Sequence, residues 1–584
     1  MKLISLKANK SSFHPINFKN GINIVVGKQA IPSCENDGNT YNGVGKSLIL
    51  HLVHFCLGSN KIDSFEQKIP DWEFTLRFEH DGKVYFVTRG TVNQNKINFC
   101  GEKLSVGELR KKLLNICFDI SDTPKMMTWN TLFSRFARRY RLCYSTFDSF
   151  TPKESDYSKL LNNCYLLGID IDLIVRKKEL RDRQTAIKNT ETALKKDPLF
   201  KQYYIGNHDA EIDSIDLEIR IENLKKQISD FKVSNDYHKL EEEADEKSYQ
   251  KKILENKRVV INNHIKNIEI ALQETSKVEE EKLISVYEAA KIEIPEMVKK
   301  SLEEVRIFHD SLISNRNTRL RRDLNKYRRD IKSIDEEVAT LGKRMDELLS
   351  YLNSHGALEE YIALTKELSS VQNEFDRIQE YQKILKAYKD EKMNIKVAML
   401  SDDKDTEEYL EDEKELLSVL KSTFYSYAKR FYPQKRSGLI INNNSGENML
   451  RYSLDARIED DSSDGVNEVR MFCFDLLLLM TKKSNMRFLA HDSRLFANMD
   501  PRQRETLFRL VYENCNNEDM QYFCTINEDA LSSFNQLMSK EDYHKIVSDN
   551  IILELNDDSP QSKLLGRQLD IDLEDKNKIE NDMS

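Results

Sequence analysis

A strict heptad pattern in the middle of the chain constrains the fold more than any other feature. Between residues 320 and 352, apolar side chains alternate in steps of four and three residues. They are Leu320, Leu324, Tyr327, Ile331, Ile334, Val338, Leu341, Met345, Leu348 and Leu352. This spacing is typical of a left-handed coiled coil, so the helix needs a partner helix. Ser354–His355–Gly356 interrupts the pattern, which resumes in a new phase at Tyr361, Leu364, Leu368, Val371, Phe375 and Ile378.

An earlier part of the chain shows a similar pattern. The same spacing recurs at Leu217, Ile221, Leu224, Ile228 and Phe231. Between the two regions, residues 293–296 combine a helix break with a proline suited to a helix start. We therefore predict an intramolecular antiparallel coiled-coil hairpin, with arms of about 85–120 residues and about 130–180 Å. Its parts are an ascending arm at 156–285 with a break near 198–207, a tip at 286–300 and a descending arm at 301–420.

Two mixed α/β segments, residues 1–155 and 421–555, flank the helical region. The first contains an apolar strand at 21–27 and two alternating runs around an Asp81–Gly82 turn. The second contains strand candidates at 487–490 and 521–526. Each segment carries only part of the motifs described below, so we predict that both assemble into one α/β unit. The alternative is two separate domains joined by a helical spacer.

Composition agrees with long helices rather than with several compact domains. Charged residues make up 32% of the 584 residues and hydrophobic residues 39%, with only 18 Gly and 10 Pro. Few helix breakers and much charge favour solvated helices and exclude collagen-like, mucin-like and disulfide-rich classes. The net charge of −9 argues against a passive nucleic-acid coat but allows a local basic groove. For the acidic tail at 556–584 we expect disorder, with docking through Leu564–Leu565 and Leu569–Ile571–Leu573 as the alternative.

Cysteines and apolar runs indicate the cellular location. The nine Cys contain no CxxC pair, so no zinc motif is visible, and their odd number fits a reducing compartment. The N-terminus has no apolar core of the signal-peptide type. The most apolar run, Val469–Met480, has about twelve residues, whereas a membrane span needs about twenty. We expect a cytoplasmic protein that does not cross a membrane.

The strongest chemical motif is the run Gly43–Ser47, which precedes an apolar helix. In such phosphate-binding loops backbone N–H groups face the phosphates, a lysine reaches the β- and γ-phosphates, and a serine hydroxyl binds Mg²⁺. The helix N-terminus adds partial positive charge. Thr40 replaces the usual first glycine, but Gly27 ends the strand, so residues 28–41 are interpreted as an insertion. The predicted ATP-binding residues are Asn42, Gly43, Gly45, Lys46 and Ser47.

A second motif supplies a metal ligand. The apolar strand that includes His491 ends in Asp492, as in the magnesium-site motif of many phosphate-loop ATPases. We predict that Ser47 and Asp492 hold Mg²⁺. In many such ATPases a glutamate follows this aspartate and polarises the attacking water, but here the residue is Ser493. His491 or Glu528 is a candidate substitute for that base, and otherwise hydrolysis is slow.

Three weaker features accompany these motifs. Ser463 and Gly465 open an apolar helix, either as an anion-binding turn or as an ordinary N-cap turn. Asn527 follows the strand at 521–524, where a polar residue can sense a γ-phosphate. The arginines of the run 134–140 are compatible with phosphate or DNA contacts, and equally with a solvated helix face.

In this order the motifs resemble the SMC-like branch of the ABC-type ATPases. More closely, the chain is similar to bacterial SMC-like ATPases associated with ABC three-component systems, which are thought to act in defence against phage and other foreign DNA. The closer resemblance is carried by NGVGKSLIL (42–50), VYEAAKIEIPEMVKKSLEEVRIFHDSLISNR (286–316), FLAHDSRLF (488–496) and CTINED (524–529). It implies an α/β fold: an ABC-type ATPase head assembled from the N- and C-terminal segments, with the hairpin between them.

The resemblance also implies a role for each motif. Ser463 and Gly465 would contact the γ-phosphate bound by the opposite subunit, and Asn527 stands where a switch histidine is usual. Asp492, His491 and Asn527 are the expected catalytic residues. Neither head has a complete site, so two heads would form a homodimer around ATP and Mg²⁺. Head movement would then change the coiled coil and any DNA contact.

The expected function is an ATPase, slow if Ser493 has no substitute. It would control binding or sensing of double-stranded DNA within a multi-protein bacterial defence or DNA-repair complex. The alternative is a nucleotide-gated protein assembly module with slow or no hydrolysis and no direct DNA binding. A structural coiled-coil protein with a dead nucleotide site is least favoured because Gly45–Lys46–Ser47 is intact. No carboxylates are paired at metal spacing, so any nuclease activity would come from a partner.

Overall fold

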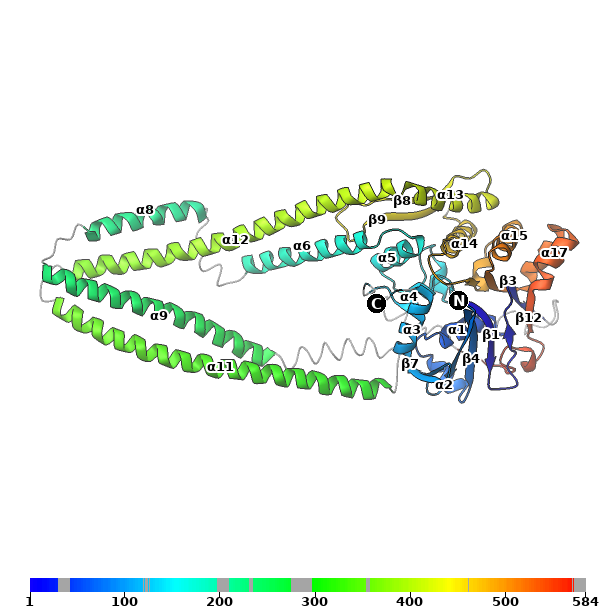
Figure 1. Cartoon of the computed structure of the whole chain (residues 1–584), viewed down its shortest axis with the longest axis horizontal. Helices are drawn as coiled ribbons and strands as arrows, with labels where there is room; N and C mark the ends of the chain where they lie inside the picture. The colour runs from blue at the N-terminus through cyan, green and yellow to red at the C-terminus, as the bar shows by residue number, and fades with distance from the viewer. Residues whose placement is uncertain are drawn as a thin grey trace. The chain divides into compact units, whose positions relative to one another are not determined.

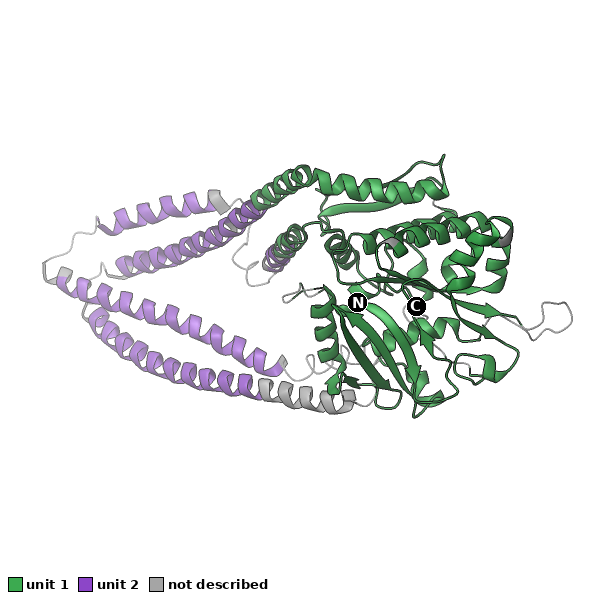
Figure 2. Ribbon diagram, turned by 45° about the vertical axis from the view of Figure 1, so that its right-hand side comes forward, with its two compact units in different colours: residues 1–183, 396–584 green, residues 184–395 purple. Residues whose placement is uncertain are grey.

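The computed structural model describes residues 1–29, 43–118, 120, 124, 126–196, 210–229, 235–274, 297–352, 358–460, 462–569 and 571. The chain divides into two compact units (Figure 2). The α/β unit comprises residues 1–183 and 396–584, and the helical unit comprises residues 184–395. Both ends of the chain therefore belong to one unit, and the other unit is inserted between them.

The α/β unit contains three sheets (Figure 1). An antiparallel sheet has the order β2-β1-β4-β5-β6-β7, a parallel sheet has the order β10-β11-β3-β12, and β8-β9 is an antiparallel pair. The strands are β1 (Lys2–Ala8), β2 (Ile16–Asn17), β3 (Gly21–Lys28), β4 (Glu73–His80), β5 (Lys83–Gly90), β6 (Lys96–Phe99), β7 (Glu102–Ser105), β8 (Ser437–Asn443), β9 (Tyr452–Ile458), β10 (Phe488–His491), β11 (Gln521–Asn527) and β12 (Ile551–Asn556). The strands predicted at 21–27, 487–490 and 521–526 correspond to β3, β10 and β11.

The parallel sheet joins the two segments of the α/β unit. β3 from the N-terminal segment lies between β11 and β12 from the C-terminal segment, with Gly27 beside Asn527. Its sequence, GINIVVGK, is buried along almost its whole length, as expected for a central parallel strand covered on both faces. Because both segments build one sheet, two separate domains joined by a spacer are excluded.

Helices pack around the three sheets and close a single apolar core. Those of the α/β unit are α1 (Lys46–Cys56), α2 (Asp63–Lys68), α3 (Val106–Phe118), α4 (Trp129–Phe133), α5 (Asp156–Leu167), α13 (Lys414–Phe431), α14 (Asp464–Met480), α15 (Pro501–Asn517), α16 (Glu528–Ser532) and α17 (Lys540–Ile546). The apolar run at 469–480 belongs to α14 and is largely buried. None of the described helices combines the length and apolar character that a membrane span requires.

Long paired helices make up the helical unit. They are α8 (Ala210–Ser229), α9 (Asn235–Glu274) and α11 (Met297–Leu352), with parts of α6 (Asp172–Lys196) and α12 (Leu358–Asp412). α8 packs on α12 through the predicted heptad positions Leu217, Ile221, Leu224, Leu364, Leu368, Val371, Phe375 and Ile378. α9 packs on α11, and ion pairs between Glu269 and Arg328 and between Glu243 and Arg344 show that these two helices run antiparallel. The heptad seam is thus a helix–helix interface.

Some predicted features lie outside the described residues. They are the break near 198–207, most of the insertion at 28–41, the interruption at 354–356 and the tip up to residue 296. The predicted boundary at residue 420 falls inside α13, which continues to Phe431. The expectation of a disordered tail is wrong as far as residue 569, because Leu564 and Leu565 are buried in the core of the α/β unit.

Candidate nucleotide-binding site

The run Gly43–Ser47 forms a turn that leads directly into α1. Gly43 and Gly45 have φ angles of 78° and 99°, in the left-handed region that glycine adopts without strain. α1 begins at Lys46, and the first N–H groups of a helix have no intrahelical partner and attract anions. The turn therefore has the backbone of a phosphate-binding loop. Asn42 lies outside the described residues, so its nucleotide contact stays a prediction.

Lys46 folds back over the carboxyl end of β3. A Cβ atom added to Gly27 would lie 2.5 Å from Lys46 Nζ and 2.7 Å from its Cδ, so only glycine leaves room for this side chain. Lys46 is 6% exposed. Burial lowers the pKa of its ammonium group to about 8, although Asp492 and Asp529 act in the opposite direction. An anion bound beside this lysine would favour its charged form.

Ser47 and Asp492 are in direct contact. Ser47 Oγ donates a hydrogen bond to the Asp492 carboxylate, at 2.9 Å from Oδ1 and 3.0 Å from Oδ2. Thr525 Oγ1 also donates to Asp492 Oδ1, at 2.7 Å, and Arg494 Nε lies 3.6 Å from Asp492 Oδ2. Asp492 is 1% exposed. A carboxylate and a hydroxyl are the hard oxygen donors that Mg²⁺ prefers, so the two predicted metal ligands fit this ion.

The parallel sheet explains how these residues meet. Asp492 follows β10, Thr525 lies near the end of β11, and Gly27 lies near the end of β3. Ligands of open parallel sheets bind outside the carboxyl ends of the strands, and this is that edge. Asn527 lies beside Gly27 in the register of β11 and β3. Its Oδ1 is buried and has no hydrogen-bond partner among the described residues, so this amide is available to a ligand or to water.

His491 is placed differently from a catalytic base. Its ring is fully buried, with Nδ1 3.1 Å from Tyr522 Oη and Nε2 3.0 Å from Asp475 Oδ2. Burial lowers the pKa of the imidazole. Because both ring nitrogens already have partners, neither is left for a water molecule at the phosphate loop. The geometry favours a positioning role for this histidine, one residue before Asp492.

A buried ion pair completes that positioning network. Arg138 Nε and Nη2 donate to the two carboxylate oxygens of Asp475, at 2.5 and 2.7 Å. Tyr144 Oη donates to the Arg138 carbonyl and accepts a hydrogen bond from the Asp492 N–H at 2.9 Å. Sequence reasoning missed this network. The sequence contains one indication of this network: Asp475 lies inside the most apolar run of the chain, and a buried carboxylate requires a partner.

Most arginines of the run 134–140 form ion pairs inside the core. Arg135 is buried and pairs with Glu154 at 3.1 Å, and Arg138 pairs with Asp475. Neither therefore contacts phosphate or DNA, and neither lies on a solvated helix face. Arg139 is half-buried, and its guanidinium lies 4.3 Å from the centre of the Tyr140 ring.

Ser463 and Gly465 open α14 and are separate from the loop at α1. Ser463 is the N-cap residue, but its side chain makes no capping hydrogen bond. Gly465 is buried against the backbone, since a Cβ atom there would lie 2.7 Å from the Asn498 carbonyl oxygen. Neither residue lines the cavity at the phosphate loop. Their predicted contact with a nucleotide of the opposite subunit stays a prediction.

The cavity at the phosphate loop has a wall that the motifs did not predict. Its volume is about 190 Å³, and Gly43–Leu48 and Ser493 form one side. The other side is the C-terminal segment with Lys563, Leu564, Leu565, Arg567, Leu569 and Ile571. This segment matches none of the nucleotide-binding motifs in the sequence. Its apolar residues, Leu564–Leu565 and Leu569–Ile571–Leu573, were the indication that it docks.

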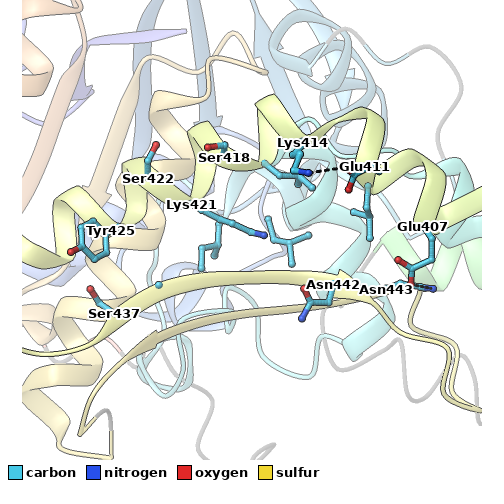
Figure 3. A pocket seen from close by; sticks show the side chains of 15 residues that line it. Glu407, Glu411, Lys414, Ser418, Lys421, Ser422, Tyr425, Ser437, Asn442 and Asn443 are labelled. Atoms are coloured by element: carbon cyan, nitrogen blue, oxygen red, sulfur yellow. Dashed lines mark hydrogen bonds and ion pairs between the residues drawn. The ribbon is translucent and has the colours of Figure 1, made fainter.

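A larger groove lies elsewhere in the α/β unit. It has a volume of about 890 Å³ and runs between β8 and the end of α12 with α13 (Figure 3). Charged and polar side chains from the helices face it, including Lys421 and the ion pair between Lys414 and Glu411. No residue of Gly43–Ser47 lines this groove, so it is distinct from the cavity at that loop.

Comparisons with known proteins give one family match over part of the chain and several similar solved structures. The family described as "Uncharacterised protein conserved in bacteria (DUF2326)" matches residues 427–569. No curated protein gives a significant match. The chain is similar to the Smc head domain with a coiled coil and joint from Pyrococcus yayanosii, at 14% identity and a TM-score of 0.32, with 91% of this chain and 93% of that chain covered.

A second solved structure gives a similar result. The Smc head domain with an extended coiled coil from Pyrococcus furiosus, bound to the C-terminal domain of ScpA, is 11% identical, with a TM-score of 0.32 and 91% of each chain covered. At these scores a likeness does not establish a shared activity. The chemistry of this protein has to be inferred from its own site.

Proposed function

We propose that the protein is an SMC-like, ABC-type ATPase that binds ATP with Mg²⁺ at the carboxyl edge of the parallel sheet. One observation carries the proposal: Ser47 and Asp492 are hydrogen-bonded beside the buried Lys46, at the N-terminus of α1. Lys46 and Ser47 belong to the N-terminal segment of the α/β unit, and Asp492 belongs to its C-terminal segment. Their meeting at a helix N-terminus supports a triphosphate site rather than a chance glycine-rich turn.

Each group has a part in holding the nucleotide. The N–H groups at the start of α1 and the Lys46 ammonium would bind phosphate oxygens. Ser47 and Asp492 would hold Mg²⁺, which when bound neutralises charge on the phosphates. Thr525 orients the Asp492 carboxylate, since it donates to Oδ1. Asn527, with its buried and unpartnered Oδ1 atom, would orient the γ-phosphate or a water molecule beside it.

The proposal includes a homodimer of ATPase heads. Ser463 and Gly465 lie at another helix N-terminus and do not line the cavity at the phosphate loop of their own chain. We assign them to the nucleotide of a second copy, so that ATP would join two α/β units. The dimer would control binding of double-stranded DNA as the ATPase of a multi-protein bacterial defence or DNA-repair complex.

The test is ATP turnover by the full-length protein, with and without double-stranded DNA. Lys46→Ala should abolish ATP binding and turnover, whereas Lys540→Ala, which removes an exposed lysine of the same unit, should leave both unchanged. Turnover that rises with DNA and disappears in Lys46→Ala supports the proposal. Equal turnover by Lys46→Ala and the unaltered protein would refute a nucleotide site at this loop.

A nucleotide-gated assembly module without intrinsic hydrolysis is the second candidate function. It is favoured by Ser493 at the position where a glutamate base is usual, and by the two occupied nitrogens of His491. This candidate predicts that ATP drives dimerisation, measured by light scattering, with no turnover and no effect of DNA. Turnover of many ATP molecules per chain would exclude it.

A further inference from the structure

The C-terminal segment Lys563–Leu569 is held against the phosphate loop by backbone hydrogen bonds. The Leu564 N–H donates to the Val44 carbonyl at 3.0 Å, and the Leu564 carbonyl accepts from the His14 N–H at 3.0 Å. Ser12 Oγ donates to the Leu565 carbonyl at 2.9 Å. The segment therefore bridges the loop and the turn that follows β1.

Side-chain packing fixes the same contact. Leu564 is fully buried, and a Cβ atom on Gly45 would lie 2.6 Å from the Leu564 Cβ. Gly45 thus serves two purposes, since its left-handed conformation forms the turn and its missing side chain admits Leu564. A change in the backbone of Gly43–Ser47 would disturb this contact. The C-terminal segment therefore packs as a fixed part of the loop's environment.

Two cations of the segment line the cavity at the phosphate loop. Lys563 is buried, and its Nζ atom donates to Gln568 Oε1. Arg567 is exposed, and among the described residues its guanidinium makes no hydrogen bond or ion pair. An exposed arginine on the wall of this cavity is suited to phosphate oxygens, which its planar group binds through two donors.

We propose that the segment Lys563–Leu569 is a wall of the nucleotide site, and that Arg567 binds the phosphate chain of the nucleotide held by its own subunit. The inference rests on the proposed function, because it needs a triphosphate at Gly43–Ser47. It adds the Arg567 guanidinium to the cations Lys46 and Lys563 that line the same cavity. Leu564 acts as the positioning residue, since its N–H and side chain fix the wall against Val44 and Gly45.

The experiment measures ATP affinity of the full-length protein by isothermal titration in the presence of Mg²⁺. Arg567→Ala should weaken ATP binding about tenfold, as expected for the loss of one charge-assisted hydrogen bond. Arg567→Lys should keep part of the affinity, since it keeps the charge. The matched control is Arg436→Ala, an exposed arginine of the same unit that does not line the cavity, and its affinity should be unchanged.

Thermal unfolding without nucleotide separates binding from folding. Arg567→Ala should melt at the same temperature as the unaltered protein, because the side chain is exposed. ATP affinity equal to that of the unaltered protein, or a loss matched by Arg436→Ala, would overturn the inference. Failure of this inference can be distinguished from failure of the proposed function. If the proposed function is wrong, the unaltered protein and Lys46→Ala would bind ATP equally or not at all.

Discussion

The two units of this protein use charge in opposite ways. In the α/β unit the ion pair between Arg138 and Asp475 is almost completely buried, with exposed side-chain fractions of 1% and 0%. In the helical unit the pair between Arg258 and Asp335 has nearly the same length, 2.7 Å, but the two side chains are 47% and 45% exposed. At an exposed pair, water screens the two charges and can hydrogen-bond to each of them. Inside the core no water does so, and breaking a buried pair of similar length therefore costs much more stability.

The difference shows where this fold can tolerate change. The buried pair Arg138–Asp475 orients the strand end that carries Asp492, and loss of one partner leaves an unpaired charge in the core. The paired helices have a narrow apolar seam and solvated charges along both sides. Single polar substitutions should therefore be severe in the α/β unit and mild in the helical unit.

Removal of Asp475 should have the largest effect. Asp475→Ala leaves Arg138 buried without its carboxylate and removes a hydrogen-bond partner of His491. We expect a loss of about 3–5 kcal/mol in the free energy of unfolding of the α/β unit. Thermal unfolding followed by circular dichroism measures it as a lower melting temperature of that unit.

The control for this change is Asp455→Ala, which breaks an exposed ion pair with Arg457 in the same unit and should change stability little. The double variant Arg138→Met with Asp475→Leu removes both charges and should recover part of the lost stability. An unchanged melting temperature for Asp475→Ala would show that burial of this pair does not matter.

A glutamate in place of Ser493 tests whether the α/β unit lacks only a catalytic base. Ser493 lines the cavity at the phosphate loop, directly after Asp492. We expect Ser493→Glu to raise ATP turnover about 100-fold, the usual contribution of a positioned base. The same change in a Lys46→Ala background should give no turnover. If Ser493→Glu turns over ATP no faster than the unaltered protein, the base is supplied by another group.

Gly27 tests the placement of Lys46 without removal of any polar group. Gly27→Ala would bring a methyl group within 2.5 Å of Lys46 Nζ, so the lysine must move away from the end of β3. We expect ATP affinity to fall about tenfold, the loss of one charge-assisted contact. Gly107→Ala is the matched control, because a Cβ atom there meets nothing within 4 Å. Unchanged ATP affinity in Gly27→Ala would mean that Lys46 does not bind the nucleotide from this position.

The sequence could predict which residues of the candidate site lie at the same edge of the sheet, because the signals are local. The turn Gly43–Ser47 and the strand-end Asp492 are each visible within a few residues, and parallel pairing brings strand ends together. The heptad seam could be predicted for the same reason, since a periodic pattern specifies which face of a helix packs. In both regions the residue types and their spacing are sufficient to predict the local structure.

What the sequence did not predict depends on contacts between distant residues. Nothing near Arg138 indicates that Asp475 is its partner, and nothing near His491 shows that Tyr522 and Asp475 occupy both ring nitrogens. The C-terminal wall was not predicted, because the apolar residues of the tail indicate that it can dock but not that it docks against the phosphate loop. Which side chains contact one another in a core depends on the packing of the whole fold. A single sequence does not show these contacts.

The smallest effect is expected on the surface of the helical unit. Arg258→Ala breaks the exposed pair with Asp335 and should cost less than about 0.5 kcal/mol, a loss that added salt would remove. Ile334→Ala, next to Asp335 but buried in the seam, should cost about 2 kcal/mol, because it leaves a cavity. Thermal unfolding of the helical unit, at low and high salt, compares the two variants. Greater destabilisation by Arg258→Ala than by Ile334→Ala would mean that ion pairs, rather than the apolar seam, hold these helices together.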